Sequence, residues 1–328
     1  MPGRSMTPLD LPQAAVPVAH ARPDSPADEL RFLLHAAVLA LSESYVPPWR
    51  FQIDGNRADL YVDFARTWRE TDPSGREMTL ACGAALSYLQ AEATRQGRGI
   101  AIRPYPDPLR PELLARVWLE PVDARPADPW SRPVARERLV WNAGADSAPG
   151  GAALGALEDA VARSAAWLHV EQRLDRRAAV AGLIAESDDQ HTRDPLRRRA
   201  QTAHQGPNRW RLPPQPPAGR LEPFVIHPTA GHRAGERLAP GAPGHPVFAV
   251  LGTAGDSRHD WLHAGQALGR LLMQARRHKI LPAFRSQLIR VPVLRTRLGE
   301  LIGRDGFPQV MLALLPDPPL PGTRPAAG

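Results

Sequence analysis

Histidine side chains are the residues of this chain whose chemistry first suggests a site, because neutral imidazole is a common metal ligand. Eleven histidines are present, and the densest group comprises His227, His232, His245 and His259. Their spacings match no zinc pattern, and the proline- and glycine-rich sequence around the first three is typical of solvated loops. His259, next to Asp260, fits the start of a helix better. We therefore expect no metal site.

Motifs that identify several large enzyme classes are missing from the sequence. There is no Gly-x-Ser-x-Gly turn, which would present a nucleophilic serine, and no glycine-rich phosphate loop. No Gly-x-Gly-x-x-Gly follows an expected strand. The sequence therefore gives no support to a hydrolase, a kinase or a Rossmann-type dinucleotide-binding protein.

The charge balance is basic, with 41 Lys and Arg against 34 Asp and Glu and a formal net charge of +7. Clustered cations would favour a nucleic-acid partner through counterion release. Lys279 is the only lysine, and arginine is abundant together with alanine, proline and glycine, which is typical of a GC-rich genome. The densest basic run, residues 197–199, is short. We therefore expect no nucleic-acid partner.

Location and redox chemistry follow from the apolar runs and the cysteine count. No stretch of the sequence is apolar enough for a membrane span, and the first residues carry prolines and an acid where a signal peptide needs an apolar run. We expect a cytoplasmic protein. The single cysteine, Cys82, lies in the small, apolar segment 80–86, which favours a buried structural thiol over a reactive one.

Apolar residues at helical and alternating spacing outline a first lobe over residues 25–120. Ser25 followed by Pro26 has the pattern of a helix N-terminus, and apolar residues then recur at helical spacing up to Leu41. The Asp54-Gly55 pair between two alternating runs predicts a β-hairpin. The further elements expected here are an alanine-rich helix at 75–96, a strand at 100–103 and a helix-to-strand stretch at 112–120.

A second lobe is expected over residues 134–316, after a linker at 121–133. Ser257 should begin a helix, since an acid stands three residues later and basic residues close its end. The proline- and histidine-rich stretch 207–246 has no sustained period, so we expect a lid-like excursion there. The other expected parts are helices at 152–167, 176–186 and 293–302, strands at 247–251 and 310–315, a disordered N-terminal segment at 1–24 and a proline-rich tail at 317–328.

Several short, separated sequence motifs occur in an order that is characteristic of one family. Residues 40–51 keep Ser42 and Trp49 of the motif Ala-Pro-Ser-x-His-Asn-Thr-Gln-Pro-Trp-Arg-Phe, and Arg132 and Arg136 stand at the arginines of Arg-x-Thr-x-Arg. The other matching motifs are residues 72–77, 82–86 and 260–268. In these motifs the chain resembles the two-lobed, nitroreductase-like flavoproteins of the actinobacterial Acg type.

The resemblance implies an α+β protein in which two nitroreductase-like lobes are fused in tandem, with mixed sheets flanked by helices. It also implies one bound FMN and NAD(P)H as the electron donor. The substrate would be a small conjugated or electron-poor molecule that is reduced or oxidised by hydride transfer. Because the fusion supplies both halves of the pocket, we expect a monomer with no membrane partner.

The same resemblance assigns the candidate cofactor-binding residues. Arg132 and Arg136 would hold the flavin phosphate, for which a pair of planar guanidinium groups is suited. The other candidates, Ser42, Ser44, Tyr45 and Trp49, belong to the first motif. No side chain is assigned a catalytic role, because the flavin would carry the chemistry. Trp49 has a second interpretation, as an anchor that packs the hairpin.

Three departures from the first motif favour a second hypothesis. Ser44, Tyr45 and Pro47 replace the histidine, asparagine and glutamine of the family motif. The lost amides are the groups expected to hydrogen-bond the isoalloxazine edge, whereas a tyrosine offers one hydroxyl and a ring that can stack. The alternative to an FMN oxidoreductase is therefore a flavin-free or flavin-sequestering protein whose pocket is rebuilt for binding or for a non-redox reaction.

Asp72 and Arg76 stand where a loop enters the helix expected at 75–96. One interpretation is structural: an N-terminal cap from the aspartate together with an ion pair between the two side chains. The other places both side chains in the cofactor pocket. The sequence leaves both interpretations open.

Overall fold

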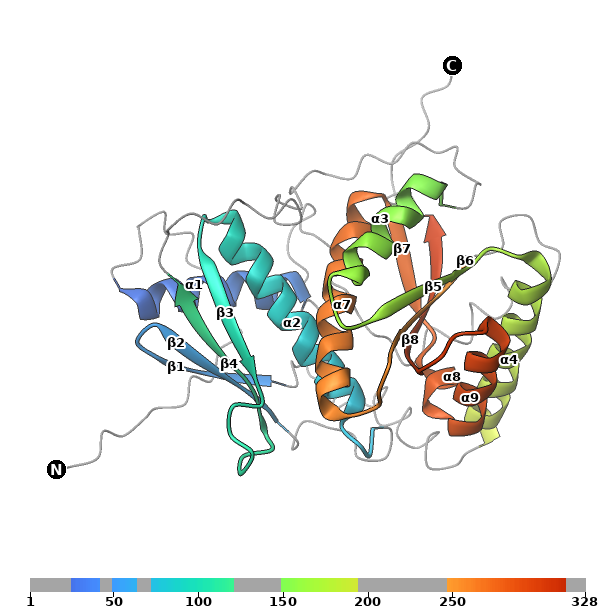
Figure 1. Ribbon diagram of the computed structural model, residues 1–328, viewed down its shortest axis with the longest axis horizontal. Helices are drawn as coiled ribbons and strands as arrows, with labels where there is room; N and C mark the ends of the chain where they lie inside the picture. The colour runs from blue at the N-terminus through green and yellow to red at the C-terminus, as the bar shows by residue number, and fades with distance from the viewer. Residues whose placement is uncertain (1–24, 42–48, 64–71, 121–148, 194–246, 317–328) are drawn as a thin grey trace, which may run out of the picture.

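The computed structural model describes residues 25–41, 49–63, 72–120, 149–193 and 247–316. These ranges form two lobes that lie side by side, with helices α2 and α7 between their sheets (Figure 1). The expected N-terminal segment, linker, lid-like excursion and C-terminal tail lie outside the described residues. The division into lobes can therefore be followed only through the described elements.

The first lobe is an antiparallel sheet of four strands in the order β1-β2-β4-β3, covered by α1 and α2. Gly55, at φ 58°, supplies the left-handed conformation that the tight turn between β1 and β2 requires, so the expected hairpin is confirmed. Ser25 Oγ accepts the Asp28 N–H at 3.2 Å, which confirms the expected helix start. The elements are α1 (Pro26–Leu41), β1 (Trp49–Asp54), β2 (Arg57–Val62), α2 (Arg76–Arg95), β3 (Gly99–Pro104) and β4 (Leu113–Glu120).

The second lobe repeats this topology with longer connections. Its four strands lie in the order β5-β6-β8-β7, which matches the first sheet strand for strand, and α7 occupies the place of α2. Helices α4, α8 and α9 are additions on its outer side (Figure 1). The elements are α3 (Gly151–Ala162), β5 (Trp167–Glu171), α4 (Leu174–Arg193), β6 (Val247–Thr253), α7 (Arg258–Arg277), β7 (Ile280–Phe284), α8 (Ser286–Arg290), α9 (Pro292–Ile302) and β8 (Phe307–Pro316).

The chain is an α+β protein, as expected, but the expectation of mixed sheets is wrong. All neighbouring strands described in both sheets pair antiparallel. In each lobe a helix connects two strands that run in the same direction, β2 to β3 and β6 to β7. The final strand of the lobe lies between them and runs the opposite way. Strands that run in the same direction therefore alternate with strands that run the opposite way, and in neither sheet are two parallel strands neighbours.

Three element assignments also differ from the sequence expectation. Residues 113–120 are strand throughout, because β4 lies in the middle of its sheet and pairs on both sides. The helix expected at 152–167 ends at Ala162, and the short strand β5 follows. Strand β7 was not anticipated because Pro282 interrupts it, and a proline is tolerated there since β7 lies at the edge of its sheet.

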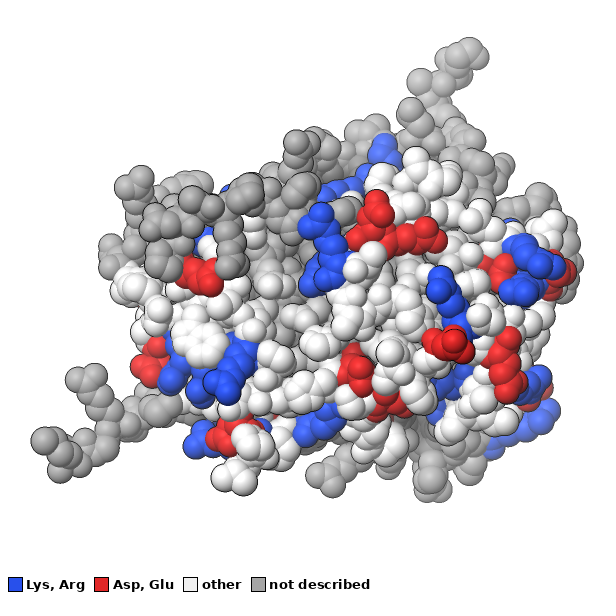
Figure 2. Space-filling view, viewed as in Figure 1, with Lys and Arg blue, Asp and Glu red and all other residues white. Residues whose placement is uncertain are grey.

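Charges of both signs are interspersed over the face drawn in Figure 2. Several described arginines form ion pairs with nearby acids, for example Arg173 with Asp175 at 2.8 Å and Arg297 with Glu186 at 2.7 Å. The described part of this face therefore shows no large patch of one sign. None of the described helices combines the length and apolar character that crossing a membrane demands.

Helices α2 and α7 touch through their backbones, and this contact joins the two lobes. An added Cβ on Gly83 would lie 2.3 Å from the carbonyl oxygen of Leu262, and one on Gly265 would lie 2.2 Å from that of Leu80. Ser87 Oγ also donates across the interface to the Gln266 carbonyl at 2.7 Å. Leu262 of α7 packs into the core of the first lobe, and Leu80 of α2 packs into a core of the second. Each lobe thus completes part of the other's interior.

Replacing Gly265 by alanine should destabilise the protein by about 3 kcal/mol, because the new methyl group would overlap backbone atoms that cannot move independently. Urea denaturation followed by circular dichroism would measure the change in free energy of unfolding.

Gly182→Ala is the matched control, because Gly182 lies within α4 and an added Cβ there has no atom within 4 Å. This variant should be about 0.5–1 kcal/mol more stable, since alanine favours a helix. Equal stability of the two variants would contradict the close packing of α2 on α7.

Candidate functional site

The first turns of α2 and α7 meet at one end of their interface. Leu80 lies against Gly265, and Ala84 and Ser87 lie against Gly269, so the two helices run in the same direction. Their N-termini therefore point to the same side of the protein. Each helix N-terminus carries the equivalent of roughly half a positive charge. We call the polar residues gathered here, from both lobes, the lobe junction.

Helix α7 begins with a complete capping box. Ser257 Oγ accepts the Asp260 N–H at 3.3 Å, and the Ser257 N–H donates to Asp260 Oδ2 at 2.9 Å. The helix start expected from the sequence is thus confirmed. Because Asp260 serves the cap, the carboxylate of the preceding acid, Asp256, is available for other partners.

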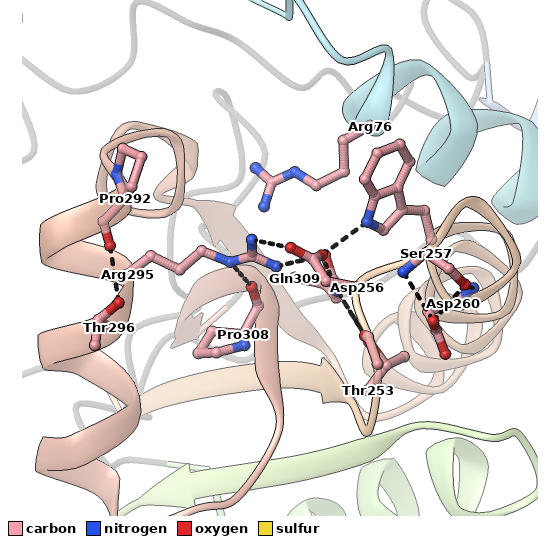
Figure 3. Close-up of polar contacts among 12 residues, drawn as sticks. Arg76, Thr253, Asp256, Ser257, Asp260, Pro292, Arg295, Thr296, Pro308 and Gln309 are labelled. Carbon is pink, nitrogen blue, oxygen red and sulfur yellow. Dashed lines mark hydrogen bonds and ion pairs between the residues drawn. The ribbon is translucent and has the colours of Figure 1, made fainter.

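Asp256 is the centre of the hydrogen-bond network on the second lobe (Figure 3). Arg295 of α9 donates to both of its carboxylate oxygens, at 2.7 and 2.8 Å. Trp261 Nε1 and Gln309 Nε2 donate to Asp256 Oδ1 at 2.8 and 2.9 Å. Gln309 Nε2 also reaches Thr253 Oγ1 at 2.9 Å. One carboxylate therefore ties together the ends of β6, α7, α9 and β8.

These contacts determine the acidity of Asp256. Partial burial acts to raise its pKa, but the hydrogen bonds from Arg295, Gln309 and Trp261, with the charge of Arg295, lower the pKa to about 2. Arg295 is itself fully engaged, because its Nε donates to the Pro308 carbonyl at 2.6 Å and its Nη2 donates to Gln309 Oε1 at 3.0 Å. The Asp256–Arg295 ion pair is therefore present at neutral pH and is lost only in strong acid.

On the first lobe, Asp72 caps α2. Its Oδ2 accepts the Met78 N–H at 3.1 Å, and Gly75, at φ 71°, provides the left-handed turn that leads into the helix. Burial, followed by the nearby charge of Glu77, raises the pKa of Asp72. The cap expected from the sequence is confirmed. The expected ion pair with Arg76 is wrong, since the acid within 4.0 Å of Arg76 is Glu77.

Arg76 and Glu77 differ sharply in how their charges are satisfied. Arg290 of α8 donates to both oxygens of Glu77 at 2.5 Å, so this carboxylate forms a bidentate pair across the lobes. Arg76 Nη2 lies 4.0 Å from the same carboxylate and forms no hydrogen bond within the part of the chain that the structure describes. Only 9% of the Arg76 side chain is exposed. Its charge is thus buried, and its nearest carboxylate lies at the outer limit of an ion pair.

The cofactor-binding residues expected from the sequence are for the most part not placed. Ser42, Ser44, Tyr45, Arg132 and Arg136 lie outside the described residues. Trp49 is described: it is buried in the first-lobe core, which confirms its role as an anchor of the hairpin. Its indole Nε1 is buried without an acceptor among the described atoms. Cys82 is likewise buried, and burial raises the pKa of its thiol, as expected for a structural residue.

Sequence reasoning missed most of the lobe junction. Asp256, Arg290, Arg295 and Gln309 belong to no recognisable spacing, and Glu77 lies 213 residues from its partner Arg290. The acid directly before the Ser257 cap was the available signal, since a helix needs only one capping acid and Asp256 was left over.

Comparison with known proteins tests the resemblance. No family model matches the chain. A Mycobacterium tuberculosis protein provisionally named NAD(P)H nitroreductase is 26% identical over 302 residues, which cover 87% of this chain and 84% of that protein. An uncharacterized protein of the same organism is 26% identical over 297 residues, covering 83% and 82%. The protein provisionally named NAD(P)H nitroreductase acg is 30% identical over 96 residues, 29% of each chain.

The chain is thus similar over most of its length to nitroreductase-like actinobacterial proteins. The resemblance to the Acg type, expected from separated phrases of the sequence, is thereby confirmed. Since 87% of the chain is matched, the similarity extends over both lobes and over the helices that join them.

Asp256→Asn should lower the free energy of unfolding by about 1–2 kcal/mol at pH 7, because the variant loses the charge that Arg295 pairs with. The pKa of Asp256 is about 2 when folded and about 3.9 when unfolded, so its contribution is present above pH 4 and is lost as the pH falls towards 2. The stability difference between the two proteins should therefore shrink over that interval in urea titrations.

Asp175→Asn is the control, since Asp175 forms an exposed ion pair with Arg173 and should change stability at pH 7 very little. A pH-independent difference for Asp256→Asn would show that lost packing, not charge, is responsible.

Proposed function

We propose that this protein is a nitroreductase-like oxidoreductase that binds FMN and uses NAD(P)H to reduce a small conjugated or electron-poor substrate. The observation that carries the proposal is the similarity over 87% of the chain to a protein provisionally named NAD(P)H nitroreductase. The repeated topology of the two lobes agrees with a tandem nitroreductase-like architecture, because such a pocket needs contributions from two related halves.

The described residues fit a flavin at one point. Trp49 directly follows segment 42–48, which contains most of the flavin-like motif, and its buried indole N–H has no acceptor among the described atoms. A donor of this kind suits a carbonyl oxygen such as those on the rim of FMN. When bound, FMN would supply the hydride-transfer chemistry. Arg132 and Arg136 would hold its phosphate, and Ser42, Ser44 and Tyr45 would line its ring.

The chain's own contribution is to position and shield the cofactor. The backbone contact between α2 and α7 leaves little freedom for one lobe to shift against the other. The Glu77–Arg290 pair across the junction, at 2.5 Å, and the Asp256–Arg295 pair, at 2.7 Å, hold the ends of these helices in place. A rigid junction of this kind would hold the cofactor and the substrate in a fixed geometry for hydride transfer.

The second candidate is a flavin-free or flavin-sequestering protein. Ser44, Tyr45 and Pro47 replace the family residues expected to hydrogen-bond the flavin ring, and this observation favours a rebuilt pocket. An absorbance spectrum of the purified protein discriminates the two. Flavin bands that persist after gel filtration, with NADH or NADPH oxidation on addition of a nitroaromatic compound, support the oxidoreductase. A colourless protein that takes up no added FMN supports the alternative.

Arg132→Ala and Arg136→Ala should each weaken FMN binding by about 1.5–3 kcal/mol, the scale of a charge-assisted hydrogen bond. Quenching of flavin fluorescence on titration measures the affinity. Arg297→Ala is the control, because Arg297 is an exposed arginine paired with Glu186 and should leave FMN affinity unchanged. Unaltered FMN affinity in the double variant, with its circular dichroism spectrum intact, would remove both arginines from the site.

A further inference from the structure

Arg76 is a buried cation whose donors are not used. Its guanidinium carries five N–H groups, and no described residue accepts a hydrogen bond from them. The nearest carboxylate, on Glu77, lies 4.0 Å away and already has both oxygens occupied by Arg290. A buried guanidinium whose hydrogen bonds are not made is costly, so proteins retain one where a ligand or partner completes those bonds.

Arg295 shows how the same junction satisfies the hydrogen-bond donors of another arginine. Its side chain is 15% exposed, and it donates to Asp256, to the Pro308 carbonyl and to Gln309. Arg76 extends towards this network without joining it (Figure 3). Burial, and after it the positive charge of Arg295, lowers the pKa of Arg76. Three nearby carboxylates act in the opposite direction, but among the described contacts none of them accepts a hydrogen bond from Arg76.

Each of the acids near Arg76 already has donors of its own. Glu77 and Asp256 pair with other arginines, and Asp72 and Asp260 cap the starts of α2 and α7. None of these four described carboxylates is therefore free to accept from Arg76. The carboxylate of a ligand would supply the missing acceptors, because its two oxygens match the fork of a guanidinium.

We propose that Arg76, at the converging N-termini of α2 and α7, binds the carboxylate group of a small organic acid. The two oxygens accept hydrogen bonds from the free guanidinium, and the helix dipoles stabilise the remaining charge. The site does not depend on the proposed flavin chemistry, because it is built from described residues of the junction and binds its ligand without a redox step.

Thermal unfolding of the purified full-length protein in acetate or benzoate, against chloride at equal ionic strength, tests the site. Both carboxylates should raise the melting temperature saturably, and chloride should not. Arg76→Met should weaken benzoate binding about 10- to 100-fold, because it removes the charge-assisted hydrogen bonds. Without benzoate this variant should be at least as stable as the wild type, since it no longer buries a charge whose hydrogen bonds are not made.

Arg297→Met, at an exposed arginine, should keep the full benzoate response. The proposal is overturned if carboxylates act no differently from chloride, if Arg76→Met responds as the wild type does, or if only phosphate stabilises. If Arg76→Met does not fold, Arg76→Lys replaces it. A lysine cannot bind a carboxylate bidentately, so the Arg76→Lys variant should bind benzoate measurably more weakly than the wild type. Unchanged benzoate affinity, measured by calorimetry, would overturn the proposed site. None of these measurements uses flavin absorbance. A negative result would therefore reject the carboxylate site without bearing on the proposed oxidoreductase activity.

Discussion

The direct backbone contact between α2 and α7 is the constraint on which the rest of this structure depends. At Gly83 and Gly265 the helices approach so closely that a single methyl group on either residue would overlap a carbonyl oxygen. Helix backbones at this distance can neither slide nor rotate without losing contact along their length. The two lobes therefore behave as one unit, and the cores of both contain a leucine from the other's central helix.

The polar junction follows from this contact. Because the helices run in the same direction, their positive ends coincide, and side chains from α8, α9, β6 and β8 converge on them. Most of the charges there are satisfied in pairs, with Glu77 on Arg290 and Asp256 on Arg295. Arg76 is the exception. In a low-dielectric environment, a buried charge whose hydrogen bonds are not made costs free energy. Such a charge therefore points to a ligand more strongly than an exposed charge does.

The relation to nitroreductase-like proteins and the departures in the flavin-like motif concern different parts of the molecule. The similarity extends over most of the chain, including the elements that hold the lobes together. The departures at Ser44, Tyr45 and Pro47 concern a short segment that would touch the flavin ring. An architecture can persist while its pocket changes, because the packing of α2 on α7 imposes no requirement on those side chains.

Local patterns in the sequence were sufficient for much of the fold. The Ser25 and Ser257 helix starts, the Asp54-Gly55 hairpin, the burial of Cys82 and the relation to Acg-type proteins could all be predicted, because each depends on residues close together in the chain or on a recognisable phrase. The strand order could not be predicted, since the last strand of each lobe inserts between two earlier ones. The lobe junction could not be predicted either. Glu77 and Arg290 are 213 residues apart, and what brings them within 2.5 Å is the packing of two glycine-containing helices, which no local pattern encodes.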